Sequence, residues 1–179
     1  MNEGKKICMF CGHGCVYGKA ILESKLKCII RKLVENGNVD TFYSSGIGDF
    51  DMLCEKYVRD LQKRHSDVKL CLIIPHITKD IMNDFYKYNR MYDKIIFTDM
   101  EKRYNNDPTI NKNMWMVNNS DCMLVYVFRK SGMDRDTLRY GIKKNKPIID
   151  VTYTQNYCWH KNSCWKRNLS AAIRLLKSI

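Results

Sequence analysis

The sequence lacks any run of about 18 or more apolar residues, the length that a helix needs to cross a bilayer. Its first residues, MNEGKK, lack the apolar region of a secretion signal. No proline- or glycine-rich linker, internal repeat or low-complexity segment interrupts it. We therefore expect a cytoplasmic protein without membrane association. The 179 residues, 45% of them hydrophobic, are expected to form a single domain over residues 1–179.

Cysteine spacings of the kind found in zinc ribbons and fingers are also missing. The nine cysteines are odd in number and several lie inside apolar runs, which favours buried free thiols over disulfides. A metal site is the alternative. Its candidate ligands form two groups, Cys8, Cys11, His13 and Cys15, and Cys158, His160 and Cys164. Because residues 8 and 11 would point to opposite faces of a strand, we expect no bound metal, and we expect no other cofactor.

A dense basic run is missing too, although 31 Lys and Arg against 19 Asp and Glu give a net charge of +12. This excess favours anionic partners. The basic residues are scattered, as on solvated helix faces, so the fold would have to gather them around a cleft. A nucleic-acid surface stays open, but it is not favoured because no motif for one is recognisable.

Short apolar runs alternate with segments of helical periodicity. This alternation predicts an α/β, Rossmann-like fold, with a mostly parallel sheet and helices on both faces. The predicted strands are 6–11, 41–43, 69–74, 94–98, 122–128 and 146–151. The predicted helices are 19–35, 51–64, 110–118, 136–145 and a last one from about 168. The inward face of the first helix is predicted to carry Leu22, Leu26, Ile29, Ile30 and Leu33.

Residues 44–51, SSGIGDFD, join a predicted strand to a predicted helix. Glycines at such a junction permit positive φ and close contact, and the first helical turn offers unpaired N–H groups to an anion. Ligands of parallel sheets lie beyond the carboxyl ends of the strands, an edge that also gathers residues 12–14, 75–76 and 131–133. The pattern predicts contact with the phosphate or sugar of a nucleotide. An ordinary tight turn is the alternative.

Two carboxylates follow this junction on one helix face, Asp51 and Glu55. They are candidates to hold a ribose, or to act as acid and base. Alternatively, Asp51 complements the helix N-terminus and Glu55 pairs with Arg59.

Other candidates also have structural alternatives. His13, between two glycines, is a candidate donor to a phosphate or a structural turn residue; His76 is a weaker candidate. Asp121 fits a turn or cap. Ser131 and Gly132 precede a helix whose N–H groups either bind an anion or are capped.

Six segments, in this order and spacing, resemble the SLOG superfamily, specifically its YpsA-like branch of small stand-alone proteins. They are residues 11–14 (CGHG), 45–51 (SGIGDFD), 72–75 (LIIP), 112–121 (KNMWMVNNSD), 130–133 (KSGM) and 146–149 (KPII). The resemblance covers about residues 5–151. It implies a Rossmann-like, nucleotide-ligand-binding domain, with Asn113 in the pocket and Trp115 packing or stacking. A core tryptophan and a loop-bonding asparagine are the alternatives.

The chain also departs from this family. Relatives usually carry an arginine where it has Gly14, and Gly-Gly pairs where it has Ser45-Gly46 and Gly132-Met133. The wider superfamily includes the Lonely Guy phosphoribohydrolases, whose motif ends in a glutamate where this chain has Arg139. Because glycosidic cleavage needs negative charge beside the oxocarbenium ion, Arg139 argues against that activity.

The first hypothesis is a binding module that holds a nucleotide or nucleotide-derived small molecule as a sensor or by sequestration, with homo-oligomer formation left open. The alternative is a nucleotide N-glycosidase that uses Asp51 and Glu55. A second alternative is a nucleic-acid-associated protein, since the superfamily includes a DNA-processing branch. The expected ligand-binding residues are Gly12, His13, Gly14, Ser44, Ser45, Gly46, Gly48, Asp51, Asn113, Ser131 and Gly132.

Overall fold

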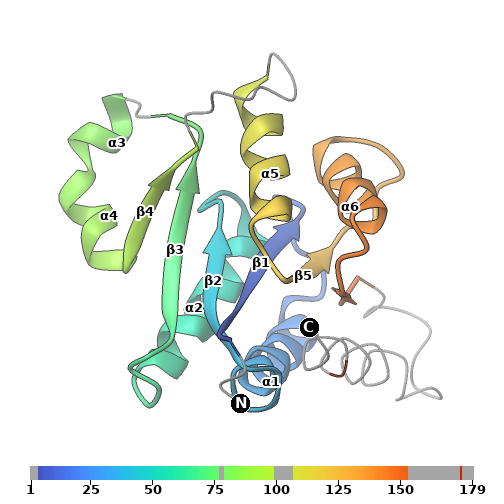
Figure 1. Ribbon diagram of the computed structural model, residues 1–179, viewed down its shortest axis with the longest axis horizontal. Coiled ribbons are helices and arrows are strands. Elements are labelled where there is room, and N and C mark those ends of the chain that lie inside the picture. Colours follow the sequence, from blue (N-terminus) through green and yellow to red (C-terminus); the bar gives the residue numbers. More distant parts are fainter. Residues whose placement is uncertain (1–3, 77–78, 99–106, 153–173, 175–179) are drawn as a thin grey trace.

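The computed structural model describes residues 4–76, 79–98, 107–152 and 174 (Figure 1). Its elements are, in order, β1 (Lys6–Gly12), α1 (Lys19–Gly37), β2 (Val39–Ser44), α2 (Asp49–Gln62), β3 (Lys69–Ile74), α3 (Lys79–Asn83), α4 (Phe85–Met91), β4 (Lys94–Phe97), α5 (Pro108–Asn118), β5 (Cys122–Tyr126), α6 (Met133–Lys143) and β6 (Ile148–Asp150). The helix predicted from about residue 168 lies outside the described residues, and a single domain over the whole chain stays a prediction.

Within the described ranges, six strands form one sheet in the order β4-β3-β2-β1-β5-β6, and every neighbouring pair is parallel. This confirms the predicted Rossmann-like α/β fold. β1 pairs with β2 on one side and with β5 on the other. The strand order therefore changes direction at β1, which is where open parallel sheets place their ligands.

Two apolar clusters cover the two faces of the sheet. One joins the sheet to α1 and α2 and contains all five residues predicted for the inward face of α1, each with 0% of its surface exposed. The other joins the sheet to α5 and α6 through Met116, Val117 and Leu138. The helical periodicity of residues 19–35 thus predicted both the element and its buried side.

The structure differs from the sequence prediction at several element boundaries. Two short helices, α3 and α4, lie between β3 and β4 where none was predicted, and α4 has no buried residue that would mark an inward face. Helices α2 and α6 begin two and three residues earlier than predicted, at Asp49 and Met133. Each follows a glycine with positive φ, Gly48 at 89° and Gly132 at 106°. None of the helices described here has the length and apolar character required to span a membrane.

Candidate functional site

A pocket of about 270 Å³ lies beyond the end of β1, and residues of α2, α5 and α6 form its walls. It combines apolar walls with a few polar groups, as ligand pockets usually do. The lining residues are Met9, Phe10, Cys11, Gly12, Gly14, Ser45, Ile47, Asp51, Thr109, Lys112, Asn113, Met116, Met133, Asp134 and Thr137. We call this the rim pocket.

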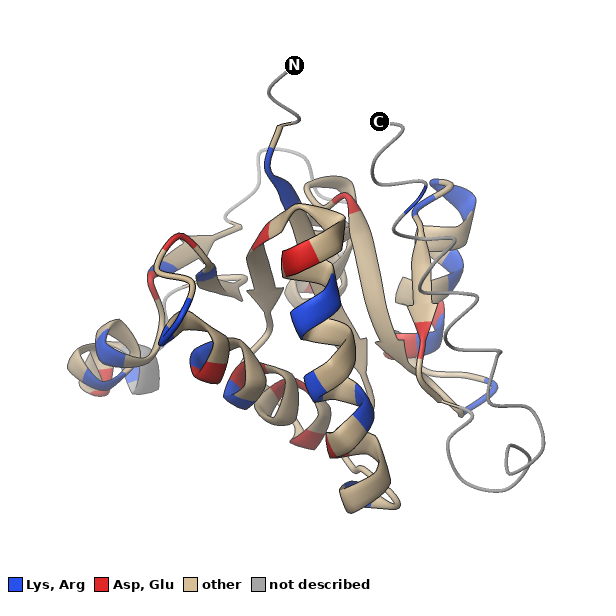
Figure 2. Cartoon of the chain, turned by 90° about the horizontal axis from the view of Figure 1, so that it is seen from below, with Lys and Arg blue, Asp and Glu red and all other residues tan. Residues whose placement is uncertain are grey.

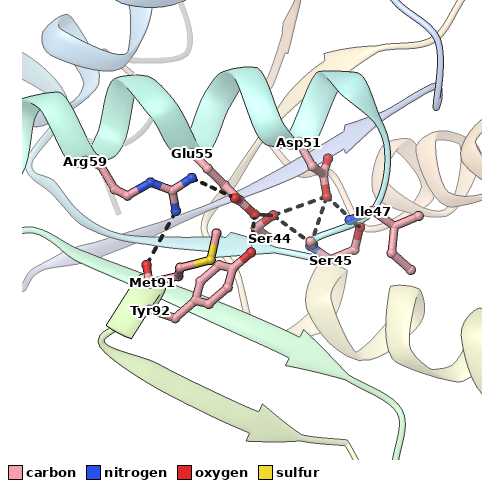
Figure 3. A network of polar contacts seen from close by, with 9 residues as sticks. Ser44, Ser45, Ile47, Asp51, Glu55, Arg59, Met91 and Tyr92 are labelled. Carbon is pink, nitrogen blue, oxygen red and sulfur yellow. Dashed lines mark hydrogen bonds and ion pairs between the residues drawn. The ribbon is translucent and has the colours of Figure 1, made fainter. Parts of the chain in front are cut away.

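Asp51 reaches the rim pocket from the first turn of α2 and is 2% exposed. Its Oδ2 accepts hydrogen bonds from Ser45 N at 2.9 Å and Ser45 Oγ at 2.5 Å, and lies 3.3 Å from Ser44 Oγ (Figure 3). Its Oδ1 accepts no hydrogen bond from the part of the chain that the structure describes, and it is not sealed from solvent. One carboxylate oxygen is therefore fixed, and the other is available to a ligand.

Burial raises the pKa of Asp51 to about 6. The hydrogen bonds from Ser45 and the charge of Lys112 act in the opposite direction, and the charge of Glu55 raises the pKa further. The Asp51 carboxyl therefore changes its charge close to physiological pH, which is common for groups at functional sites.

Lys112 enters the rim pocket from α5 and is 3% exposed. Among the described residues, none lies within hydrogen-bond or ion-pair distance of its ammonium group. Burial lowers the pKa of Lys112, whereas the charges of Asp51 and Asp134 raise it. Most of the Lys112 side chain is buried, but its ammonium group is not sealed from solvent, so the pocket offers a cation to a bound acceptor.

Glu55 uses both carboxylate oxygens within the protein and does not line the rim pocket. Its Oε1 accepts hydrogen bonds from Ser44 Oγ at 2.7 Å and from the Tyr92 hydroxyl at 2.8 Å (Figure 3). Its Oε2 pairs with Arg59 Nη2 at 3.1 Å, the pairing weighed as the structural alternative for Glu55. Glu55 therefore has a structural role, because its hydrogen bonds connect α2 to Ser44 of β2 and to Tyr92.

Two of the predicted glycine-rich loops pack against each other at the rim. Asp49 N donates to Gly14 O at 2.9 Å, and a Cβ on Gly48 would lie 2.7 Å from the Cα of Gly14. Gly12 lies against the ring of Phe50, where a Cβ would approach within 2.3 Å of a ring atom. Gly12 and Gly48 are therefore needed for close packing of the chain itself.

The helices that follow these glycine-rich junctions begin with acidic residues. The first turn of α2 carries Asp49 and Asp51, and that of α6 carries Asp134 and Asp136. A carboxylate in the first turn neutralises the positive end of the helix dipole and repels a second anion. The geometry therefore opposes the predicted phosphate contacts at these two helix ends.

His13 is 5% exposed, and both of its ring nitrogens are engaged. Nε2 lies 3.1 Å from Phe128 N and 3.0 Å from Arg129 N, which are donors, so Nε2 must be the unprotonated acceptor. Nδ1 then carries the proton and donates to Asp134 Oδ2 at 2.8 Å. No ring N–H is left to donate to a phosphate. The geometry therefore favours the alternative for His13, a structural turn residue, over the expected phosphate donor.

Of the remaining candidates, some line the rim pocket and others make structural contacts outside it. Asn113 lines the pocket and donates to Thr137 Oγ1 at 3.2 Å. Trp115 stacks on Tyr43 in the core, with ring centroids 5.7 Å apart. The Asp121 carboxylate accepts a hydrogen bond from Ile7 N at 2.7 Å. The predicted site residues outside the pocket lining are His13, Ser44, Gly46, Gly48, His76, Ser131 and Gly132.

Two exposed aromatic rings are linked to the rim pocket through His13, which hydrogen-bonds to Asp134 of the pocket lining. Tyr17 is 53% exposed and Phe128 is 40% exposed, and their ring centroids are 5.5 Å apart at an interplanar angle of 68°. The ring of His13 contacts Phe128 with centroids 4.3 Å apart. The exposed basic residues Arg129 and Lys130 follow directly in sequence. We call Tyr17 and Phe128 the aromatic pair.

Sequence reasoning did not single out Lys112, Asp134, Tyr17 or Phe128 as site residues. Lys112 lies at the start of the segment 112–121 that carried the family resemblance, directly before Asn113, so its position was a usable signal. Asp134 offered none, because its contact with His13 joins residues 121 positions apart.

All seven cysteines in the described ranges carry free thiols: Cys8, Cys11, Cys15, Cys28, Cys54, Cys71 and Cys122. The same ranges contain no group of three or more His, Cys, Asp or Glu arranged to hold a metal ion. The second predicted group, Cys158, His160 and Cys164, lies outside them.

Among known proteins, the chain resembles solved structures in its fold. No protein-family model matches the chain, and the search of curated proteins finds no match. DNA processing protein A from Helicobacter pylori, whose single-stranded DNA binding mode has been described structurally, is 13% identical with a TM-score of 0.57, and the match covers 81% of this chain and 64% of that one. DNA processing protein A from Streptococcus pneumoniae is 9% identical with a TM-score of 0.60, covering 97% of this chain and 56% of that one.

The chain thus spans less than two thirds of the length of either protein. At these identities the likeness shows the fold alone. It is consistent with the SLOG superfamily resemblance, whereas the YpsA-like branch stays a prediction.

Proposed function

We propose that the protein binds single-stranded nucleic acid and takes one nucleoside of the strand into the rim pocket. The observation that carries this proposal is the exposed aromatic pair, which His13 and Asp134 link to a pocket where Asp51 Oδ1 and the Lys112 ammonium have no hydrogen-bond partner among the described residues.

The rim pocket is suited to a nucleoside. Its volume of about 270 Å³ is close to the lower end of ligand pockets, about 300 Å³. Asp51 Oδ1 can accept from a base amino group, from the ring N3–H of thymine or from a sugar hydroxyl, and Lys112 can donate to a base carbonyl. Because Asp51 and Asp134 flank the cation, a neutral group with donors and acceptors fits better than a phosphate.

The aromatic pair favours a strand over a free nucleotide. Stacking of a base on an aromatic side chain contributes about 1–3 kcal/mol and needs an exposed ring, which Tyr17 and Phe128 provide. Arg129 and Lys130, also exposed, lie where they can meet the backbone phosphates of the same strand. The fold likeness to a single-stranded DNA-binding protein adds support.

The second candidate function is binding of a free nucleotide-derived ligand, which the rim pocket alone would serve. A third, N-glycosidic cleavage, would need a different carboxylate pair from the one first considered: Asp51 and Asp134 line the pocket, whereas Glu55 does not. Release of free base from a nucleoside monophosphate by the wild-type protein would favour that activity.

Fluorescence anisotropy with a labelled 20-nucleotide oligo-dT tests the proposal. We expect saturable binding that weakens with salt, and at least about a tenfold loss in the Phe128→Ala variant from the lost stacking. Tyr86→Ala is the control, because Tyr86 is an even more accessible aromatic, 86% exposed, on helix α4. If a mononucleotide binds as tightly as the oligomer, the strand reading is wrong and the free-ligand candidate replaces it.

A further inference from the structure

A second cavity, of about 430 Å³, lies between α1 and α2 on the sheet face opposite α5 and α6. It draws its residues from the middle of α1 and the C-terminal half of α2, and it shares no lining residue with the rim pocket. We call it the α1–α2 groove.

Basic side chains form both walls of the α1–α2 groove. Lys27 and Arg31 come from α1, Lys63 and Arg64 follow the end of α2, and all four are exposed. Asp60 is the one acidic residue of the lining. Figure 2 marks Lys and Arg in blue and Asp and Glu in red along the chain. The groove is therefore a local excess of positive charge.

Two of these four cations form no ion pair with an acidic residue in the part of the chain that the structure describes. Lys63 pairs with Asp60 at 2.8 Å, and Arg31 lies 3.8 Å from the exposed Glu35. Neither Lys27 nor Arg64 lies within ion-pair distance of a carboxylate in the described ranges. The groove thus has charge available for an external anion.

The floor of the groove is largely apolar, formed by Cys28, Tyr57 and Leu61. Tyr57 is only 9% exposed, so its ring forms part of the floor and does not stand out as a platform on which a base could stack. An occupant must therefore bring negative charges for the rim together with a compact apolar group for the floor.

We propose that the α1–α2 groove binds an acidic segment of a protein partner. One apolar side chain of that segment lies on Tyr57 and Leu61, and flanking carboxylates pair with Lys27 and Arg64. Arginine can hold a carboxylate through two parallel hydrogen bonds, which adds orientation to charge. This interaction is separate from the rim pocket and does not depend on strand binding there.

Charge excludes two other occupants. Residues 153–179 of this chain contain five Lys and Arg and no Asp or Glu, so they do not complement a basic groove. A second copy carries the same net charge of +12 and would be repelled over most of its surface. Complementarity points to an acidic partner instead.

The test uses the full chain and a fluorescein-labelled peptide, Gly-Glu-Asp-Leu-Glu-Asp-Gly, in anisotropy titrations. We expect saturable binding at low salt that weakens as salt rises, because exposed charges are screened. The double variant Lys27→Glu/Arg64→Glu should weaken binding by about tenfold or more. The matched control is Lys79→Glu/Lys143→Glu, which makes the same charge change on α3 and α6 and should bind as wild type. Glycine in place of the peptide leucine should also weaken binding.

Three results would overturn the inference: no binding at low salt, equal loss in the two double variants, or displacement of the peptide by oligo-dT in the Lys112→Met background. The last would assign the groove to nucleic acid. Since Lys112 lines only the rim pocket, Lys112→Met itself should leave peptide binding unchanged, which separates this inference from the proposed function.

Discussion

Asp51 and Lys112 meet in one pocket from helices on opposite faces of the sheet. Asp51 belongs to α2 and Lys112 to α5, and the end of β1 lies between them. Each influences the ionisation of the other, since Lys112 lowers the pKa of Asp51 and Asp51 raises that of Lys112. Neither helix alone would create this acid–base pair, so the site depends on the assembled fold.

We expect Asp51→Asn to weaken strand binding by about 1.5–3 kcal/mol, because the charge-assisted hydrogen bond from a ligand to Oδ1 is lost. The fold should survive, since an amide oxygen can still accept from Ser45. Anisotropy with oligo-dT measures the affinity. Asp49→Asn is the control, because Asp49 lies in the same helical turn but is exposed and outside the pocket. Equal effects of the two variants would mean that Asp51 acts only as a helix-terminus charge.

The stability of the wild-type protein should fall as pH rises between about 4 and 6. The folded protein holds a proton on Asp51 up to a pKa of about 6, whereas the model value is 3.8, so the folded state binds more protons in this window. Protonation of Asp51 therefore stabilises the folded state at low pH. This contribution to the free energy of unfolding, up to about 3 kcal/mol, is lost as pH rises to about 6.

Urea denaturation of wild type and Asp51→Asn at pH 4, 5, 6 and 7 measures this effect. The free energy of unfolding of the wild type, relative to that of Asp51→Asn, should decrease as pH rises. A difference that stays constant across the series would contradict the raised pKa of Asp51.

Lys112→Met should abolish most strand binding, with a loss of about 1.5–3 kcal/mol for a hydrogen bond from a charged donor. It should also raise the pKa of Asp51 further, because Lys112 lowers it. The pH-dependent loss of stability should therefore move to higher pH in this variant. The control is Lys143→Met, which replaces an exposed lysine on α6. Equal strand affinities of the two variants would show that Lys112 does not contribute to binding.

His13→Ala should destabilise the protein by about 1–3 kcal/mol, because the backbone N–H groups of Phe128 and Arg129 lose their shared acceptor. The loop that carries the aromatic pair's Phe128 should loosen as well, so strand affinity should fall with stability. Thermal denaturation and anisotropy measure the two effects. His76→Ala removes an exposed histidine and should change neither. Unchanged oligo-dT affinity in His13→Ala would show that the loop needs no such support.

Much of the framework could be read from the sequence because its signals are local. The inward face of α1 and the apolar run of β3 follow from residue spacing alone. The pairing of Glu55 with Arg59 spans a single helical turn, so it too could be anticipated as an alternative. The short helices α3 and α4 were missed because no buried face distinguishes α4 from a loop.

The site was predicted in part. Asp51 and Asn113 line the rim pocket, whereas Ser44 bonds to Glu55; that Asp51 and Asn113 bind a ligand stays a prediction. The role of His13 depends on hydrogen bonds to residues 121 and 115 positions away, and that of Lys112 on the charges of Asp51 and Asp134, which lie on two other helices; no local pattern encodes either. A glycine-rich loop shows where a chain turns tightly, but it does not show whether a ligand or a second loop fills the space.

The pairing of β1 with β5 has a consequence for how the protein folds. Strands β2, β3 and β4 each pair with the strand that precedes them in sequence, so this side of the sheet needs only short loop closures. β5 must instead return to β1 across more than a hundred residues, for example in the bond from Ile7 to Asp121, which spans 114 positions. Closing so long a loop costs more entropy than the short closures, so we expect it to slow folding. Because the rim pocket exists only after α5 and α6 have docked on β1, a ligand would stabilise this last assembly step and slow its reversal.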